Sequence, residues 1–204
     1  MISTLMGQSN TALFIFAAER PVFLREYSSD HYAIVPYFLA HLCTEALQSF
    51  SAVLAQALIS YWMIGFQMAF GQYLVITYCL AMTATAVSVM LGAFFEDTKS
   101  AAGFFSLIIV PQFYFSGLFI SIEFIPVWVQ WAQYLCSLTY GSRLAFAYEF
   151  SDCDPGQAAD NCMEILDKNQ VSEDDTWWYW LALLGLFCAF RLGGICVLHS
   201  KAYY

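Results

Sequence analysis

Five charged side chains and one histidine gather near the start of the chain, in the stretch Ala18–Tyr32 (AERPVFLREYSSDHY). Only 11% of the chain is charged, and apolar runs lie on both sides of this stretch. The six residues are Glu19, Arg20, Arg25, Glu26, Asp30 and His31. Acids and bases mixed in this way are suited to salt bridges and to contacts with a partner surface.

A second pair of chemically interesting side chains is Cys153 and Cys162, in the polar segment CDPGQAADNC. If this segment faces an oxidising compartment, we expect a disulfide between them, with a free pair or an intermolecular bridge as the alternatives. Their spacing fits no standard zinc pattern and no histidine is near, so no metal site is predicted. The other five cysteines lie in apolar runs and are expected to be packing residues.

Arg191 is the third candidate, because it lies inside the last apolar segment, eight residues before His199. That spacing places it ~12 Å from the end of the segment at helical rise. An arginine at this depth either extends its side chain to the membrane surface or pairs inside the protein, for instance with Glu45. The two placements are equally compatible with the sequence.

Catalytic motifs are absent from the chain. It contains no G-x-x-x-x-G-K-[ST] loop, no H-E-x-x-H and no G-x-S-x-G. The chain therefore cannot hydrolyse ATP by itself, and no nucleophile–base or metal-ligand set marks it as an enzyme. No basic patch or motif indicates nucleic-acid binding.

The composition indicates a polytopic membrane protein of the all-α class. Of 204 residues, 60% are hydrophobic, and the mean hydropathy is +0.61. Soluble domains are usually about 45–50% apolar with about 25% charged residues. A very hydrophobic soluble protein is the less favoured alternative.

Apolar runs predict the spans. Residues Met1–Ala17 are too few to cross alone. Complete crossings are predicted at Ala46–Phe66, Tyr73–Phe95, Ala101–Ser121 and Trp177–Leu198. Pro111 should kink or break the third of them. Residues 123–150 are predicted to form a hairpin at the membrane edge.

The charge distribution predicts the orientation. Residues 149–176 form an acidic loop with nine acids and one lysine, which accounts for −8 of the chain's net charge of −9. Arg20, Arg25, Lys99 and Lys201 fall on the opposite side of the predicted spans. Because basic residues favour the cytoplasmic face, we expect the acidic loop to be extracytoplasmic.

The order of parts resembles the G subfamily of ABC transporters, the white/pleiotropic-drug-resistance type. The resemblance covers essentially the whole chain and is carried by ERPVFLREYSSDHY, YWMIG, FSGLFI, YLCSLTYGSRLAFAYEF and FRLGGICVL. It implies an ABC-2 type transmembrane domain over residues 1–204, supplying about five of six helices. The first helix and the nucleotide-binding domain would be missing.

The resemblance also implies site residues. In FSGLFI, Leu118 and Phe119 would occupy the apolar gate between inner and outer cavities. Val110 and Phe113, earlier on the same helix, would face the substrate cavity, with ordinary core packing as the alternative. Cys153 and Cys162 fall where some members carry a disulfide.

For the charged stretch, the resemblance implies a coupling helix on the cytoplasmic face. Glu19, Arg20, Arg25 and Glu26 would contact a nucleotide-binding domain, fused upstream or separate. The alternative is a solvated amphipathic helix on the membrane surface, with Phe23 and Leu24 turned inward.

The function implied is ATP-driven export of lipids, sterols or hydrophobic compounds, as a homo- or heterodimer with another half-transporter. No cofactor is expected in this chain, since the missing domain would bind ATP and Mg. The membrane would be the plasma membrane or an endomembrane. The alternative is a truncated, non-transporting protein that dimerises with full-length relatives.

Overall fold

The computed structural model of the chain describes residues 1–28, 34–95, 97–116, 130–150, 171 and 176–202. All regular structure in these residues is helical, which agrees with the predicted all-α class. The helices are α1 (Ile2–Ser28), α2 (Ile34–Ile64), α3 (Phe70–Phe94), α4 (Thr98–Phe115), η2 (Gln130–Leu135, a 3-10 helix), α5 (Ser137–Glu149) and α7 (Thr176–Ala202).

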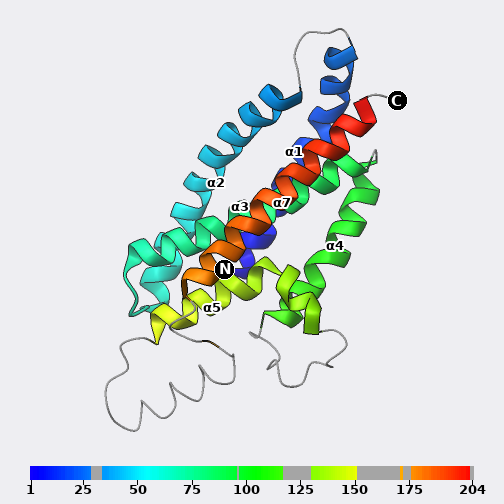
Figure 1. Cartoon of the computed structure of the whole chain (residues 1–204). Helices are drawn as coiled ribbons and strands as arrows, with labels where there is room; N and C mark the ends of the chain where they lie inside the picture. Colours follow the sequence, from blue (N-terminus) through cyan, green and yellow to red (C-terminus); the bar gives the residue numbers. More distant parts are fainter. Residues whose placement is uncertain (29–33, 96, 117–129, 151–170, 172–175, 203–204) are drawn as a thin grey trace, which may run out of the picture.

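Helix α3 is the centre of the bundle (Figure 1). It packs against α1, α2, α4, α5 and α7. Within its most apolar window 72% of the residues are buried, against 22% in α2 and in α7. The largest core cluster accordingly joins α3 to α1, α4 and α5: Leu5, Leu13, Leu80, Ala84, Val87, Leu91, Ala101, Phe105, Ile109 and Leu138.

Three helices of the described part are long and apolar enough to cross a membrane: Val35–Ile64 in α2, Phe70–Phe94 in α3 and Thr176–Ser200 in α7. They match the first, second and last predicted crossings. The predicted third crossing corresponds to α4, of which 18 residues are described, and residues 117–121 lie outside the described part.

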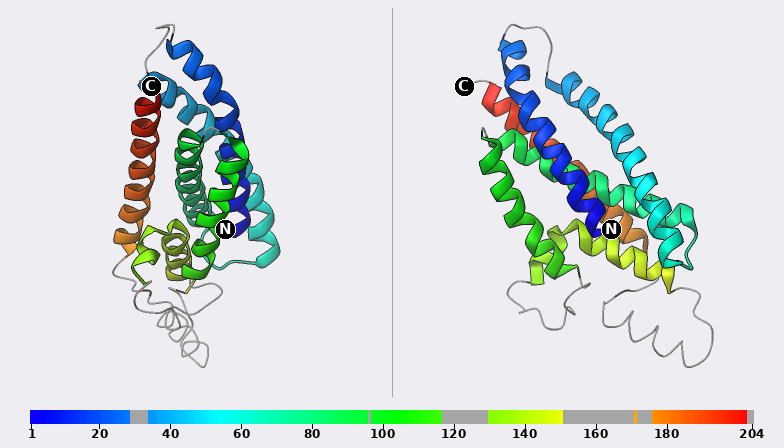
Figure 2. Two further views of the ribbon diagram at one scale, coloured as in Figure 1. Left: turned by 90° about the vertical axis from the view of Figure 1, so that its right-hand side faces the viewer. Right: turned by 180° about the vertical axis from the view of Figure 1, so that it is seen from behind.

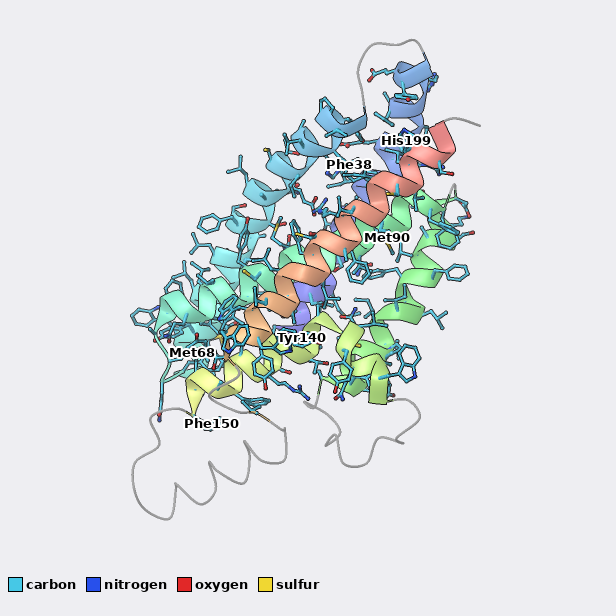
Figure 3. All side chains as sticks on the ribbon, in the orientation of Figure 1. Phe38, Met68, Met90, Tyr140, Phe150 and His199 are labelled. Carbon is cyan, nitrogen blue, oxygen red and sulfur yellow. The ribbon has the colours of Figure 1, made fainter. Side chains whose placement is uncertain are left out.

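The bundle has two distinct ends (Figures 1 and 2). At one end Phe23 of α1, Phe38 of α2, Ala93 of α3 and Leu198 of α7 belong to one buried cluster. At the other end lie Met68 and Phe150, with Met90 and Tyr140 between the two (Figure 3). The charged stretch and the flanks of the acidic loop are therefore at opposite ends, as the predicted crossings require.

Three boundaries differ from the sequence-based expectation. Helix α2 begins at Ile34, not Ala46, and continues through His41 and Glu45. The described part of the charged stretch, up to Ser28, is no separate coupling helix, because it continues α1. Of the two effects expected of Pro111, a kink or a break, the break does not occur, because α4 runs on to Phe115; α1 likewise continues through Pro21.

Local signals explain where α4 begins and where α2 ends. Asp97 is the N-cap of α4, and its carboxylate accepts a hydrogen bond from the Ser100 backbone N–H at 3.3 Å. An aspartate at this position satisfies one of the free N–H groups at a helix start. At the opposite end, Gly65 ends α2 with a φ of 73°, a conformation that suits glycine.

Described residues 130–150 form η2 and α5 rather than a clean span. Helix α5 packs against α3 and α7, and its Gly141 allows a close approach, since a Cβ there would lie 3.3 Å from the Leu80 side chain. This arrangement fits the predicted hairpin, while residues 123–129 lie outside the described part.

Candidate functional site

A buried ion pair joins α2 to α7. Arg191 Nη2 donates a hydrogen bond to Glu45 Oε2 at 2.6 Å, and each residue is only 7% exposed. The Arg191 guanidinium also lies 5.4 Å from the centre of the Phe187 ring. Of the two placements that the sequence allowed for Arg191, the structure shows the interior one. The pairing offsets the high cost of a lone charge within a membrane span.

His41 lies one helical turn before Glu45 and stands between two carboxylates. Its Nδ1 is 3.5 Å from Glu45 Oε2, and its Nε2 is 3.6 Å from Glu19 Oε2 in α1. The Phe16 ring meets the imidazole edge-on, with centroids 5.2 Å apart. These contacts become ion pairs only when His41 is protonated. No described group of acids, histidines and cysteines could hold a metal ion.

A polar pocket of about 320 Å³ lies beside this cluster, between α1, α2 and α3. Nine of its eleven lining residues are polar, in a chain that is 60% hydrophobic. The polar ones are Gln8, Thr11, Glu19, His41, Thr44, Glu45, Gln48, Ser49 and Thr85. Sequence reasoning missed this pocket. The signal was a polar stripe at helical spacing, with residues 41, 44, 45 and 48 on one face of α2.

Arg20 connects the charged stretch to the central helix. Its Nη1 donates a 2.8 Å hydrogen bond to the carbonyl oxygen of Phe95, the residue that caps the C-terminus of α3. A cation here satisfies a helix-end carbonyl and complements the helix dipole. Arg20 is only 5% exposed, so it acts as an internal anchor between α1 and α3.

The other three predicted coupling residues have more accessible side chains. Arg25 and Glu26 are exposed on the last turns of α1, and the Glu19 side chain is 52% exposed at the pocket. The structure therefore divides the set, with Arg20 directed inward and Arg25 and Glu26 directed outward. A contact with a nucleotide-binding domain stays a prediction.

The predicted cavity and gate residues are described only in part. Val110 is 49% exposed on α4, whereas Phe113 is partly buried against the largest core cluster. Leu118 and Phe119 lie outside the described residues, as do Cys153 and Cys162. The described cysteines are all unpaired thiols: Cys43, Cys79, Cys136, Cys188 and Cys196.

Glu149 closes the opposite end of the bundle, a role the sequence did not indicate. Its two carboxylate oxygens accept hydrogen bonds from the backbone N–H groups of Gln67 and Met68, at 3.0 and 3.2 Å. One side chain at the end of α5 thus holds the turn between α2 and α3. In the sequence Glu149 was indistinguishable from the acids of the following loop.

Comparison with known proteins places this helical bundle in a family. The ABC-2 type transporter family matches residues 1–150, and the chain belongs to it. Protein scarlet of Drosophila melanogaster is 26% identical over 94% of this chain and 31% of its own length. The C. elegans ABC transporter ATP-binding protein/permease wht-1 is 29% identical over 93% of this chain and 31% of its own length.

The rat broad substrate specificity ATP-binding cassette transporter ABCG2 is 26% identical over 65% of this chain, and the match covers 21% of that protein. These relatives are transporters of the G subfamily, as the sequence motifs indicated. The chain spans about a third or less of the length of these relatives. The comparisons thus identify this chain as the membrane part of a transporter. They do not address the activity of a whole transporter.

Proposed function

We propose that this chain forms the membrane-spanning half of an ATP-driven exporter of lipids, sterols or hydrophobic compounds. ATP and Mg are bound by a nucleotide-binding domain, either fused or separate, and two half-transporters form a homo- or heterodimer. The family match supports a transporter membrane part. The substrate class, the dimer and the source of energy are proposals that go beyond this match.

The observation that carries the coupling step is the hydrogen bond from Arg20 to the Phe95 carbonyl. Arg25 and Glu26 are exposed one to two turns further along the same helix. A force applied to them moves α1, and Arg20 passes it to the end of α3, which contacts every other α-helix of the described part.

For the transport path we retain the residues implied by the resemblance. Val110 and Phe113 face the substrate, and Leu118 and Phe119 form the gate. The half-exposed, apolar Val110 supports this, since a hydrophobic substrate needs apolar surface that the bundle has not already covered. The end that carries Arg25 is cytoplasmic, and the acidic loop is extracytoplasmic with a Cys153–Cys162 disulfide.

The coupling test measures ATP hydrolysis and transport together, with the chain assembled with a G-subfamily nucleotide-binding domain in proteoliposomes. Arg25→Glu should lower transport at least several-fold more than ATP hydrolysis, because the push no longer reaches α1. The matched control is Lys99→Glu, which reverses an exposed charge at the same end on α4. Equal losses of both activities, or transport by the chain without ATP, would contradict the proposal.

A further inference from the structure

We propose that the polar pocket between α1, α2 and α3 binds the ammonium group of an amphipathic amine. This site is separate from the predicted path on α4, because α2 and α4 flank α3 on different sides (Figures 1 and 2). The inference goes beyond the proposed function, since it concerns binding within one chain and does not require transport.

The pocket has a buried floor and an exposed rim. Glu45, Ser49 and Thr85 are buried in its floor, whereas Thr11, Glu19, Thr44 and Gln48 are exposed around it. Exposed polar side chains within an apolar helix pair are costly against lipid unless a polar group contacts them. The arrangement is therefore that of an open polar site.

The hydroxyl groups at the rim offer lone pairs and not protons. Thr11 Oγ1 donates to the Gly7 carbonyl at 2.9 Å, and Thr44 Oγ1 donates to the His41 carbonyl at 2.9 Å. Each hydroxyl has one proton, so these two are left as hydrogen-bond acceptors. A ligand that meets them must supply donors.

The charges of the pocket also favour a ligand that is positively charged. Its lining holds two carboxylates, those of Glu19 and Glu45, and none of the described lining residues is a lysine or arginine. Arg191 donates a hydrogen bond to Glu45 Oε2, and its positive charge offsets one of the two negative charges. Glu45 Oε1 is buried and has no hydrogen-bond partner among the described residues. Among Glu19, Glu45 and Arg191, one negative charge is left without a compensating positive charge.

An ammonium group fits this set of acceptors, because it carries a positive charge and up to three donors and has no acceptor. The volume of about 320 Å³ lies at the lower end of small-molecule pockets, which start at roughly 300 Å³. A bare monovalent cation would leave most of that volume to water, at ~30 Å³ for each molecule. The apolar Ala12 and Ile15 complete the lining and accommodate the first carbons of an alkyl chain.

The experiment measures equilibrium binding to the purified chain in uncharged maltoside micelles. Three probes with the same alkyl length are compared: decylamine, decanol and decanoate. We expect saturable decylamine binding at one site per chain, at least roughly tenfold tighter than either other probe. Equal binding of the three probes would overturn the proposal, because the head group would then not be recognised.

A matched pair of variants locates the site. Glu19→Gln removes the rim carboxylate and should weaken decylamine binding by roughly five-fold, the effect of about 1 kcal/mol for one nearby unit charge. Glu26→Gln makes the same charge change on the same helix outside the pocket and should leave the affinity unchanged. Equal weakening by both variants would assign the preference to net charge and reject the site.

The ammonium group could belong to a membrane lipid or to a free amine. In nanodiscs of phosphatidylethanolamine a resident headgroup competes, so decylamine binding should weaken at least tenfold relative to micelles if the lipid is the occupant. An undiminished affinity assigns the pocket to a free amine. Both outcomes support ammonium binding, whereas loss of the decylamine preference in nanodiscs and micelles alike rejects it.

Discussion

Arg191 and Glu45 are 146 positions apart in the sequence and form a 2.6 Å hydrogen bond inside the bundle. The pair joins α7 to α2, a helix in which only 22% of the most apolar window is buried. Much of α2 is therefore not buried against the other helices, and we expect the ion pair to contribute to the position of this helix.

The ion pair should show strong energetic coupling. Glu45→Leu or Arg191→Leu alone leaves one buried charge without a partner and should lower the free energy of unfolding by ~2–4 kcal/mol. The double variant removes both charges and should lose less than either single variant. A double-mutant cycle from thermal unfolding in detergent measures this, and additive losses would refute the coupling.

Arg20 should matter for stability more than Arg25. Arg20→Gln removes a charge-assisted hydrogen bond to the Phe95 carbonyl and should cost ~1.5–3 kcal/mol. Arg25→Gln, on the exposed side of the same helix, should change stability by less than about 0.5 kcal/mol. Chemical denaturation of both variants compares them directly. Equal effects would show that Arg20 does not anchor α1 to α3.

Glu149 should control the turn between α2 and α3. In Glu149→Gln one of the two acceptor oxygens becomes an NH₂ group, which faces a backbone N–H, so we expect a loss of ~1–3 kcal/mol. Hydrogen exchange of the Gln67 and Met68 amides should become faster. Glu26→Gln, at the other end of the bundle, is the charge-matched control and should leave these two amides unchanged.

At two glycines we expect an added methyl group to have opposite effects on stability. A Cβ at Gly92 would lie 3.0 Å from Phe16 Cδ1, and Phe16 is fully buried, so Gly92→Ala should destabilise the α1–α3 contact by ~1–2 kcal/mol. A Cβ at Gly103 meets nothing within 4 Å. Gly103→Ala should therefore be neutral or stabilise α4 by up to ~1 kcal/mol. Thermal unfolding that ranks the two variants in the reverse order would contradict this contact.

The orientation can be tested with two glycosylation acceptors. Met163→Thr completes an N-x-[ST] triplet that begins at Asn161 in the acidic loop, and Glu96→Asn creates one that ends at Thr98. Only the first should be glycosylated in eukaryotic cells, since glycans are added on the extracytoplasmic side. A glycosidase-sensitive shift of the second variant instead would reverse the proposed topology.

The sequence predicted the class, the main crossings and the two ends, because these follow from hydropathy alone. It misplaced the start of α2, because His41 and Glu45 look like interruptions until Arg191 is brought beside them. That contact joins residues far apart in the chain and leaves no local trace. Polar residues at helical spacing on α2 were the one local signal of the pocket.

The charged stretch shows a second limit of sequence reasoning. A change from apolar to charged residues at Glu19 suggests that a span ends there, yet α1 continues to Ser28. The buried Arg20 guanidinium donates a hydrogen bond to the Phe95 carbonyl, which offsets part of the cost of burying its charge. The partner again lies far away in the sequence, this time as a backbone carbonyl at the end of α3, and composition cannot reveal it.

The length of α2 has a consequence for the bilayer around the protein. Its 31 residues extend about 46 Å, whereas the hydrocarbon core of a bilayer is about 30 Å thick. The helix must therefore tilt strongly or protrude, and its slant relative to the centre of the bundle is visible in Figure 1. Hydrophobic mismatch of this size acts on a helix of whose most apolar window only 22% is buried. Membrane thickness should thus bias the position of α2. The length of the lipid chains would then influence the conformation of the transporter domain.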